Sequence, residues 1–346
     1  TAVTKGPLSD ARGNLGSMGA QANANPVAQI ISAPVVPIAN NGYWAAGNTN
    51  NSPYRYSLVE RIDFSNDTAT ATPRGNLYAV RYNGGGTGNT FFGYHGGGRN
   101  SGVSPSAISA MDRVEYANDL DTAAPKGPLS IARWMVAAMG NASYGYWAGG
   151  RSPSAVSTVD RVDFSNDTPT TSPKGPLTIA RAVSSGGTGN QSYGYVGGGD
   201  NPTRSIIERI DYSSDTSTAT VVATTGFPGN SNRGMAATGN ASYGYWGGGD
   251  YHPNEVTYIR RLDYSSDTTN ASPKGNLTAG RYKFSATGTD SYGYWGAGAY
   301  DTPSGFTTID RLDYSNDTAT AVTKGPLAIG RWGTTSTSAK EGGLPN

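Results

Sequence analysis

Short runs of apolar and aromatic residues recur along this chain, and clusters of Gly, Pro, Ser, Asn and Asp separate them. Runs such as YGYW (residues 243–246) and VDRVDF (residues 159–164) have the length of a single strand. The clusters between them contain the residues that form tight turns. Leu, Glu and Lys, which favour helices, are sparse, whereas Tyr and Gly are frequent. The pattern therefore predicts short strands joined by turns.

The runs follow one another in an order that repeats about every 50 residues, a period typical of one propeller blade. An arginine opens each unit, and four strands follow it. Strand B is the Tyr-Gly-Tyr segment, strand C resembles VDRVDF, and strand D ends before Lys-Gly-Pro. Proline in strand D suits an outer edge, because proline cannot donate a backbone hydrogen bond. The opening arginines are Arg12, Arg81, Arg133, Arg181, Arg233, Arg281 and Arg331.

The amino-acid sequence of the unit resembles known repeats. The segment SYGYWGGG (Ser242–Gly249) has close relatives at five other places, each followed by a segment like DRLDYSNDT. The glycine pair after strand B and the aromatic residue that ends strand C resemble kelch or galactose-oxidase-type β-propeller repeats. The whole unit is similar to repeats in structural and tail-associated proteins of bacteriophages. The resemblance implies one all-β, six-bladed kelch-like β-propeller of four-stranded blades over residues 1–346. Pro-Lys-Gly-Pro-Leu stands where kelch repeats usually have a tryptophan.

Strand C carries charged residues at fixed places. An arginine is followed two residues later by an acidic residue, and four residues after that by an Asp. Because residues i and i+2 of a strand lie on one face, we expect Arg–carboxylate contacts between blades. The alternatives are a ring of ligand sites and, for the Asp-containing C–D turns, calcium binding. The expected interblade residues are Arg61, Arg113, Arg161, Arg209, Arg261 and Arg311, with Asp63, Glu115, Asp163, Asp211, Asp263 and Asp313.

Composition narrows the function classes. The net charge of +1 provides no general field for nucleic acid or an anionic membrane, so neither partner is expected. The absence of cysteine excludes disulfides, thiol nucleophiles and the Tyr–Cys crosslink of galactose-oxidase chemistry. The apolar segment of residues 27–39 is too short to span a bilayer. The two histidines, His95 and His252, lie in different units. We expect no catalytic residue, no metal site and no cofactor.

The repeats differ most in the connection between strands B and C. Connections of one type lie on one face of a propeller, so these loops should share a surface. Their aromatic and polar groups suit recognition of a glycan or a protein, although solvated loops also drift in sequence. The large residues of strand B are interpreted as packing between blades. The candidate ligand-binding residues of the B–C loop face are Tyr54, Tyr56, Arg99, Arg151, Arg204, Tyr251, His252, Tyr300 and Asp301.

The two ends of the chain duplicate one strand pair. Residues 1–20 repeat the D and A sequence of residues 319–340, whereas strands B and C occur six times. One copy can close the ring, and the other is then available for assembly by strand addition. Residues 21–40 form an inserted apolar arm, of a kind that usually covers another surface. The duplication could equally mean that the chain is a window of a longer protein.

These features favour a non-enzymatic structural or adhesive protein of a phage-like virion, such as a tail fibre, or of another extracellular assembly. Its partners would be other structural proteins, further copies of itself, or a host-surface glycan in host attachment. The alternative is a lectin-like carbohydrate-binding propeller that acts through the B–C loop face. A third hypothesis, an enzyme with a site in the central channel, has no local motif to support it.

Overall fold

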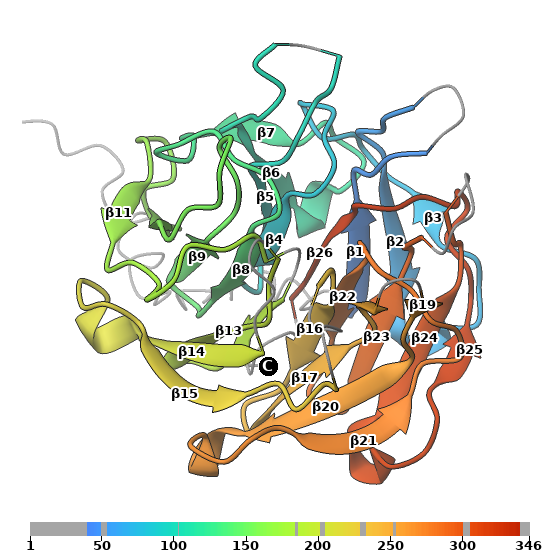
Figure 1. Ribbon diagram of the computed structural model, residues 1–346. Coiled ribbons are helices and arrows are strands. Elements are labelled where there is room, and N and C mark those ends of the chain that lie inside the picture. Colours follow the sequence, from blue (N-terminus) through green and yellow to red (C-terminus); the bar gives the residue numbers. More distant parts are fainter. Residues whose placement is uncertain are drawn as a thin grey trace, which may run out of the picture. The chain divides into compact units, whose positions relative to one another are not determined.

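The computed structural model describes residues 40–49, 54–102, 104–183, 186–200, 205–228, 233–251, 254–299 and 305–339. Within the unit Ile38–Asn346, the described strands form six four-stranded antiparallel sheets, which are the blades of a β-propeller (Figure 1). The predicted all-β, six-bladed architecture is therefore confirmed. The N-terminal strand copy (residues 1–20) and the apolar arm lie outside the described residues, apart from Asn40 at the end of the arm.

In every blade the strands lie in the order A to D from the axis outwards, and the A strands of neighbouring blades contact one another. Blade 1 contains β26 (Thr335–Ser338), β1 (Asn41–Ala45), β2 (Val59–Asp63) and β3 (Thr72–Pro73). Blade 2 contains β4 (Gly85–Gly88), β5 (Phe92–Gly96), β6 (Met111–Glu115) and β7 (Ala124–Lys126). Blade 3 contains β8 (Ala137–Gly140), β9 (Tyr144–Ala148), β10 (Val159–Asp163) and β11 (Ser172–Lys174).

The second half of the ring has the same organisation with one addition. Blade 4 contains β12 (Gly187–Gly189), β13 (Tyr193–Gly197), β14 (Ile206–Asp211) and β15 (Thr220–Thr224). Blade 5 contains β16 (Ala236–Gly239), β17 (Tyr243–Gly247), β20 (Tyr258–Asp263) and β21 (Ser272–Asn276). Its B–C connection carries the short pair β18 (Asp250–Tyr251) and β19 (Asn254–Glu255). Blade 6 contains β22 (Ser285–Gly288), β23 (Tyr292–Gly296), β24 (Ile309–Asp313) and β25 (Val322–Lys324).

The C-terminal strand copy closes the ring. Strand β26 pairs with β1, with Trp44 opposite Ser336, so the last described strand is the inner strand of the first blade. All four residues of β26 are buried, and the Thr335 Oγ1 atom lies 2.7 Å from His95 Nδ1 of blade 2. With β26 in place, every inner and outer strand position of the six blades is filled by described residues.

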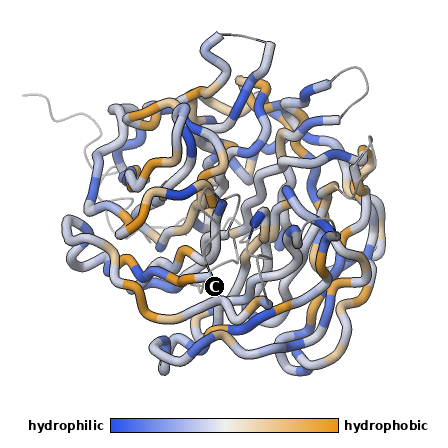
Figure 2. Tube along the Cα trace, viewed as in Figure 1, coloured by the Kyte–Doolittle hydropathy of each residue, from blue (hydrophilic) through white to orange (hydrophobic). Residues whose placement is uncertain are grey.

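The core lies between the blades. The A strands consist of Gly, Ala, Ser, Thr and one Met, because six strands meet around a narrow axis, and they are pale in Figure 2. Farther out, the strand B tryptophans are fully buried and donate to carbonyls of the preceding blade, as from Trp147 to Gly85 at 3.1 Å. This confirms the interpretation of these residues as interblade packing. A Cβ on Gly247 would lie 2.8 Å from Trp295 Nε1, which explains the glycine after the aromatic residue.

The chain leaves each C strand through a short turn, and five of these turns contain a 3-10 helix. Aspartate at the end of the strand accepts from the first free N–H groups of the turn, as Asp163 Oδ1 does from Ser165 N at 2.9 Å in blade 3. The 3-10 helices are η2 (Phe64–Asn66), η3 (Tyr116–Asn118), η4 (Tyr212–Ser214), η5 (Tyr264–Ser266) and η6 (Tyr314–Asn316). They lie at the end of the ring that also carries the A–B turns, which we name the turn face.

Candidate functional site

The polar residues of the repeat are used first to hold the ring together. In blade 3 the Arg133 side chain is fully buried, and its guanidinium donates to Asp160 Oδ2 at 2.8 Å and to the Trp147 carbonyl at 2.9 Å. Asp160 also accepts from the Ser130 hydroxyl at 2.6 Å, so the carboxylate is anchored from two sides. The equivalent buried pairs are Arg81–Asp112, Arg181–Glu208, Arg281–Asp310 and Arg331–Glu60. We name these residues the framework pairs.

Among the described residues, blade 5 shows no such pair, and its opening arginine is in a different register from the one expected. Arg233 forms a β-bridge and an ion pair with Asp250, and its side chain is 38% exposed. The next residue, Gly234, has the positive φ angle that Asn83 has in blade 2, so Arg233 corresponds to Tyr82 rather than to Arg81. Strand C of blade 5 carries Arg260 where the other blades carry Asp or Glu. Both members of the pair are replaced together, which leaves no half-pair with an unpaired buried carboxylate.

A second set of contacts joins each blade to the next. Between blades 3 and 4, Asp215 Oδ2 accepts from Arg161 Nη1 at 2.7 Å and from the Tyr146 hydroxyl at 2.9 Å. Burial and the neighbouring Asp215 raise the pKa of Tyr146, so this hydroxyl stays a donor. The same triad recurs around the whole ring, as Tyr43–Arg61–Asp119, Tyr94–Arg113–Asp167, Tyr195–Arg209–Asp267, Tyr245–Arg261–Asp317 and Tyr294–Arg311–Asp67.

The carboxylate that the strand C arginine reaches differs from the expected one. The acidic residue two positions on is the last residue of strand C. Its carboxylate accepts a hydrogen bond from a backbone N–H of the turn that follows. This holds for Asp63, Asp163, Asp211, Asp263 and Asp313, whereas Glu115 makes no such capping bond. Hydrogen bonds from Ser165 accordingly lower the pKa of Asp163. The interblade partner is instead the Asp four residues farther along, in the next blade.

The C–D turns were also the candidate calcium sites. Both carboxylates of a turn have other partners: Asp211 accepts from Ser213, and Asp215 accepts from Tyr146 and Arg161. No cluster of three or more His, Asp or Glu side chains that could hold a metal ion occurs among the described residues. The geometry of these turns is thus explained by capping and by contacts between blades.

The central channel is narrow. Its cavity has a volume of about 40 Å³ and is lined by small residues of the A strands, among them Thr87, Thr188 and Ser336. This volume suits a few water molecules rather than an organic substrate. Near the channel, the side chain of His95 is fully buried behind the A strands, where burial and then the Arg81 charge lower its pKa to about 3.

The other end of the channel, which we name the mouth, is built differently. Here each blade forms a β-bridge between two segments. One partner lies shortly before strand A, and the other lies at the start of the B–C loop. The bridges are Tyr82–Arg99, Trp134–Arg151, Ala182–Asp200, Arg233–Asp250, Tyr282–Ala299 and Asn48–Trp332. Residues beside them form backbone hydrogen bonds from blade to blade, such as Met135 N to the Asn83 carbonyl at 2.7 Å. These bridges set the positions of the side chains around the channel axis.

Aromatic and cationic side chains alternate along one arc of the mouth. The guanidinium carbons of Arg99 and Arg151 lie 5.2 and 5.5 Å from the centre of the Trp134 ring. Farther along, Tyr82 and Trp332 contact each other edge to face, with ring centres 5.3 Å apart. The Lys283 Nζ atom lies 5.1 Å from the Trp332 ring and 4.6 Å from the Tyr282 ring. We name these seven residues, Tyr82, Arg99, Trp134, Arg151, Tyr282, Lys283 and Trp332, the mouth arc.

The structure brings only part of the predicted B–C loop set to this arc. Arg99 and Arg151 belong to it. Tyr54 is 55% exposed and Tyr56 is half-buried in the loop of blade 1. Strand β18 includes the backbone of Tyr251. The remaining candidates, Arg204, His252, Tyr300 and Asp301, lie outside the described residues.

Sequence reasoning missed five members of the arc. Tyr82, Trp134, Tyr282 and Trp332 each follow the opening arginine of a unit, at a position occupied by Ala182 in blade 4. A signal was present, because the residue that follows the opening arginine varies from unit to unit. The variation is hard to recognise because the A strand that follows has a uniform composition of small residues. Lys283 follows Tyr282 with a φ of +54°, the left-handed conformation that Asn83 and Met135 have at the same place in blades 2 and 3.

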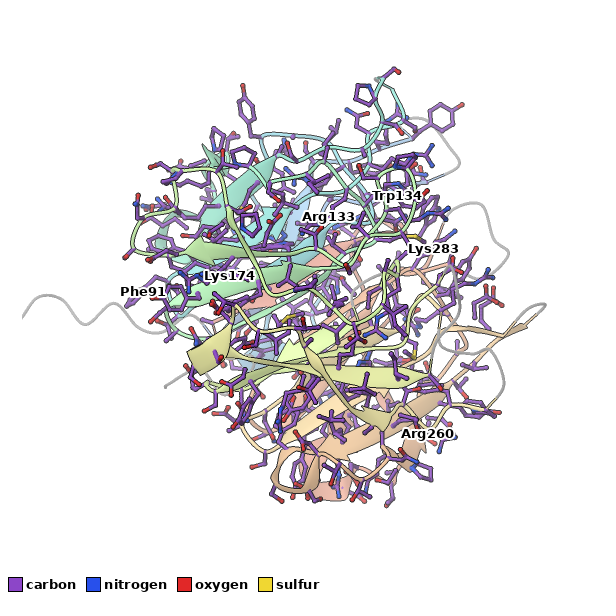
Figure 3. All side chains as sticks on the ribbon, turned by 60° about the vertical axis from the view of Figure 1, so that its left-hand side comes forward. Phe91, Arg133, Trp134, Lys174, Arg260 and Lys283 are labelled. Atoms are coloured by element: carbon purple, nitrogen blue, oxygen red, sulfur yellow. The ribbon has the colours of Figure 1, made fainter. Side chains whose placement is uncertain are left out.

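Figure 3 shows Trp134 and Lys283 on one side of the ring and Phe91 on the other. The topology explains this arrangement, because Trp134 precedes an A strand, whereas Phe91 lies in the A–B turn that follows one. Phe91 is 59% exposed on the turn face. It therefore offers an exposed aromatic side chain at the opposite end from the mouth arc.

A scan of the chain against protein-family models found no match, and a search of curated proteins found no relative. Among the described residues, no helix has the length and hydropathy needed to cross a membrane. The repeat, the ring and the mouth arc are therefore the observations on which a function has to be built.

Proposed function

We propose that this protein is a non-catalytic binding scaffold of a virion or another extracellular assembly, and that it holds its partner at the mouth. The observation that carries the proposal is the contrast between a uniform ring and a varied mouth. The framework pairs and the Tyr–Arg–Asp triads repeat with little change around the ring. The residues that break the repeat gather at the mouth, where they gain aromatic and cationic character. Similarity of the repeat to phage tail-associated proteins agrees with this role.

The described acids and bases of the ring support a non-catalytic role. General acid–base catalysis needs a titratable group that a substrate can reach. The buried carboxylates, such as Asp160 and Asp215, are bonded to arginines and backbone groups, and His95 is enclosed. The narrow channel offers a substrate no space beside them.

A second candidate function is lectin-like carbohydrate binding at the same mouth. The aromatic residues of the arc favour it, because Trp and Tyr rings pack against the C–H faces of sugars while arginines bind their polar groups. In this reading the partner is a glycan rather than a protein of the assembly.

The experiment measures binding of the full chain to itself and to a panel of surface polysaccharides. Light scattering reports self-association, and an immobilised-polysaccharide assay reports glycan binding. The double variant Trp134→Ala, Trp332→Ala removes two aromatic members of the arc. Phe91→Ala is the matched control, because it removes an exposed aromatic side chain from the opposite face.

We expect the double variant to lose at least tenfold in whichever association the native chain shows, and Phe91→Ala to keep it. Self-association that depends on the mouth favours the structural role, and polysaccharide binding that depends on it favours the lectin-like role. Loss in Phe91→Ala alone would place the interface on the turn face and contradict the proposal. Release of shortened saccharides during the assay would contradict the non-catalytic assignment.

A further inference from the structure

Some Lys and Arg side chains form no ion pair with a carboxylate of the described chain. Most described Lys and Arg side chains have a carboxylate within 4.0 Å. Those of the described chain that do not are Arg55, Arg99, Arg151, Arg260 and Lys283. Three of them, Arg99, Arg151 and Lys283, are members of the mouth arc. Cations without a carboxylate within 4.0 Å are thus most frequent at the mouth, where the more distant carboxylates of Asp250 and Asp200 also favour the protonated form of Lys283.

Arg99 and Arg151 form the most compact part of this charge. Both guanidinium groups lie within 5.5 Å of the centre of one ring, that of Trp134. The Arg99 Nε atom donates to Ser106 Oγ at 3.1 Å, which leaves the outer nitrogens of its fork for another acceptor. The tryptophan holds both flat groups in place, so less side-chain freedom is lost when an anion binds. Two like charges beside one ring also repel each other, and a bound anion would offset this repulsion.

Lys283 extends the charge across the mouth. Its ammonium lies between the rings of Tyr282 and Trp332, and its side chain is half-buried. Burial, and then the positive charge of Arg233, lower the pKa of Lys283. A bound anion would oppose this effect, since an opposite charge favours the protonated amine.

We propose that the mouth arc binds an acidic glycan, with the carboxylate or sulfate groups of the saccharide chain on Arg99, Arg151 and Lys283. This inference rests on the proposed binding function of the mouth. Guanidinium forks match the two oxygens of a carboxylate or sulfate, and such bonds are stronger than those to neutral hydroxyls. The aromatic rings between the cations contact the sugar rings. Cations repeated along an arc suit a polymer whose acidic groups repeat along the chain.

The test uses the full chain and two polysaccharides that differ only in charge. Polygalacturonate is titrated by calorimetry, and its fully methyl-esterified form serves as the neutral counterpart. Dextran sulfate replaces carboxylate by sulfate, and a single-stranded oligodeoxynucleotide of similar charge replaces the saccharide by a nucleic acid. We expect an acidic polysaccharide to bind at least tenfold more tightly than the esterified polymer, and more weakly as salt rises.

The double variant Arg99→Gln, Arg151→Gln should lose roughly a hundredfold in affinity for the acidic polymer, about tenfold for each charge-assisted contact. Arg55→Gln is the matched control. It removes the same charge from a B–C loop, where the Arg55 guanidinium donates to Ser101 Oγ at 2.6 Å, and it should change the affinity less than twofold. Unfolding midpoints of all variants show whether a loss of binding reflects a loss of fold.

The outcomes separate this inference from the proposed function. Equal binding of the esterified polymer, or loss in Trp134→Ala with retention in the double Arg variant, would overturn the acidic-glycan proposal and leave the mouth as the binding surface. Equal Arg-dependent binding of the oligonucleotide would overturn the glycan class, because it would show a site for any polyanion. Failure of both acidic polysaccharides to bind at millimolar saccharide would also overturn it.

Discussion

Arg133 and Arg151 belong to the same blade and carry the same charge, yet their surroundings have little in common. Arg133 is fully buried against Asp160 and a backbone carbonyl. Arg151 is half-buried at the mouth beside Trp134, with no carboxylate within 4.0 Å among the described residues. The charge of the framework arginine is neutralised by the carboxylate beside it. The mouth arginine carries a charge that the fold does not compensate.

The difference shows how one repeat can hold both a scaffold and a site. Arg133 and Trp134 are adjacent in the chain, and a single peptide step separates the buried pair from the mouth arc, in which Trp134 is half-buried. The arginine is kept because removal of one member of a buried pair leaves the other charge unpaired. The next position faces the mouth and is free of that constraint, so Trp, Tyr, Ala and Arg all occur there.

The largest effect should come from breaking the framework pair itself. Asp160→Asn leaves the Arg133 charge buried without a counter-charge, and we expect it to lower the free energy of unfolding by about 3–5 kcal/mol. Urea denaturation at neutral pH measures the loss. The double variant Arg133→Met, Asp160→Asn should lose less than the sum of the single losses, because it leaves no buried charge, whereas each single variant leaves one. Strict additivity would show that the two residues do not act as a pair.

A second effect should appear at acid pH, through the one strand B histidine. His95 stands where other blades have Trp or Val, and its pKa of about 3 lies below the unfolded value of about 6.5. Between these values the unfolded chain binds more protons, so stability falls as pH falls from about 6.5 towards 3. The contribution of His95 at about pH 5 is a loss of about 2 kcal/mol relative to pH 8.

His95→Gln should remove this part of the pH dependence, because glutamine does not titrate. Denaturant midpoints of the native chain and the variant, measured across this pH range, give the difference. His95 contacts Thr335 of the closing strand, so the effect reports on the closure of the ring. Parallel pH profiles for the two proteins would show that the pKa of His95 is the same in the folded and the unfolded chain, and would contradict this prediction.

Much of the framework could be predicted from the sequence, because the same local pattern recurs in six units and each copy supports the same assignment. The A-to-D order, the blade number and the packing role of Trp147 follow from residues that recur at one spacing. The contact between the strand C arginines and carboxylates of a neighbouring blade was also expected. Its partner was assigned to Asp163 because strand geometry places i and i+2 on one face. The strand ends there, and the carboxylate caps the turn instead.

The mouth could not be predicted in the same way. The partners there, such as Arg99 and Trp134, come from different blades, and the residue type at both positions changes from blade to blade. Arg233 illustrates the limit, because its sequence position suggests a framework arginine, whereas its bridge with Asp250 places it one residue later. One inserted or deleted residue in a connection changes such an alignment, and only the backbone bridges reveal it.

Removal of one tyrosine hydroxyl from an interblade triad should lower the stability less than breaking a framework pair. Tyr245→Phe removes the bond from the hydroxyl to Asp317 Oδ2, which is 2.9 Å long, and keeps the ring that stacks on Tyr314. Because the acceptor is charged and nearly buried, we expect a loss of about 2 kcal/mol in the free energy of unfolding. Tyr78→Phe, at a tyrosine that is 69% exposed, should change the same quantity little. Equal effects of the two variants would contradict a special role for the triads.

The smallest effect on stability should come from the mouth. Arg151→Gln removes a contact with Trp134 that contributes about 0.5–1 kcal/mol, and it also relieves repulsion from Arg99 on the same ring. These changes oppose each other, so we expect the free energy of unfolding to change by less than about 0.5 kcal/mol. The same denaturation experiment that reports a large loss for Asp160→Asn measures this near-zero value. A loss of several kcal/mol would place Arg151 in the framework, and the mouth would then hold no charge in reserve for a ligand.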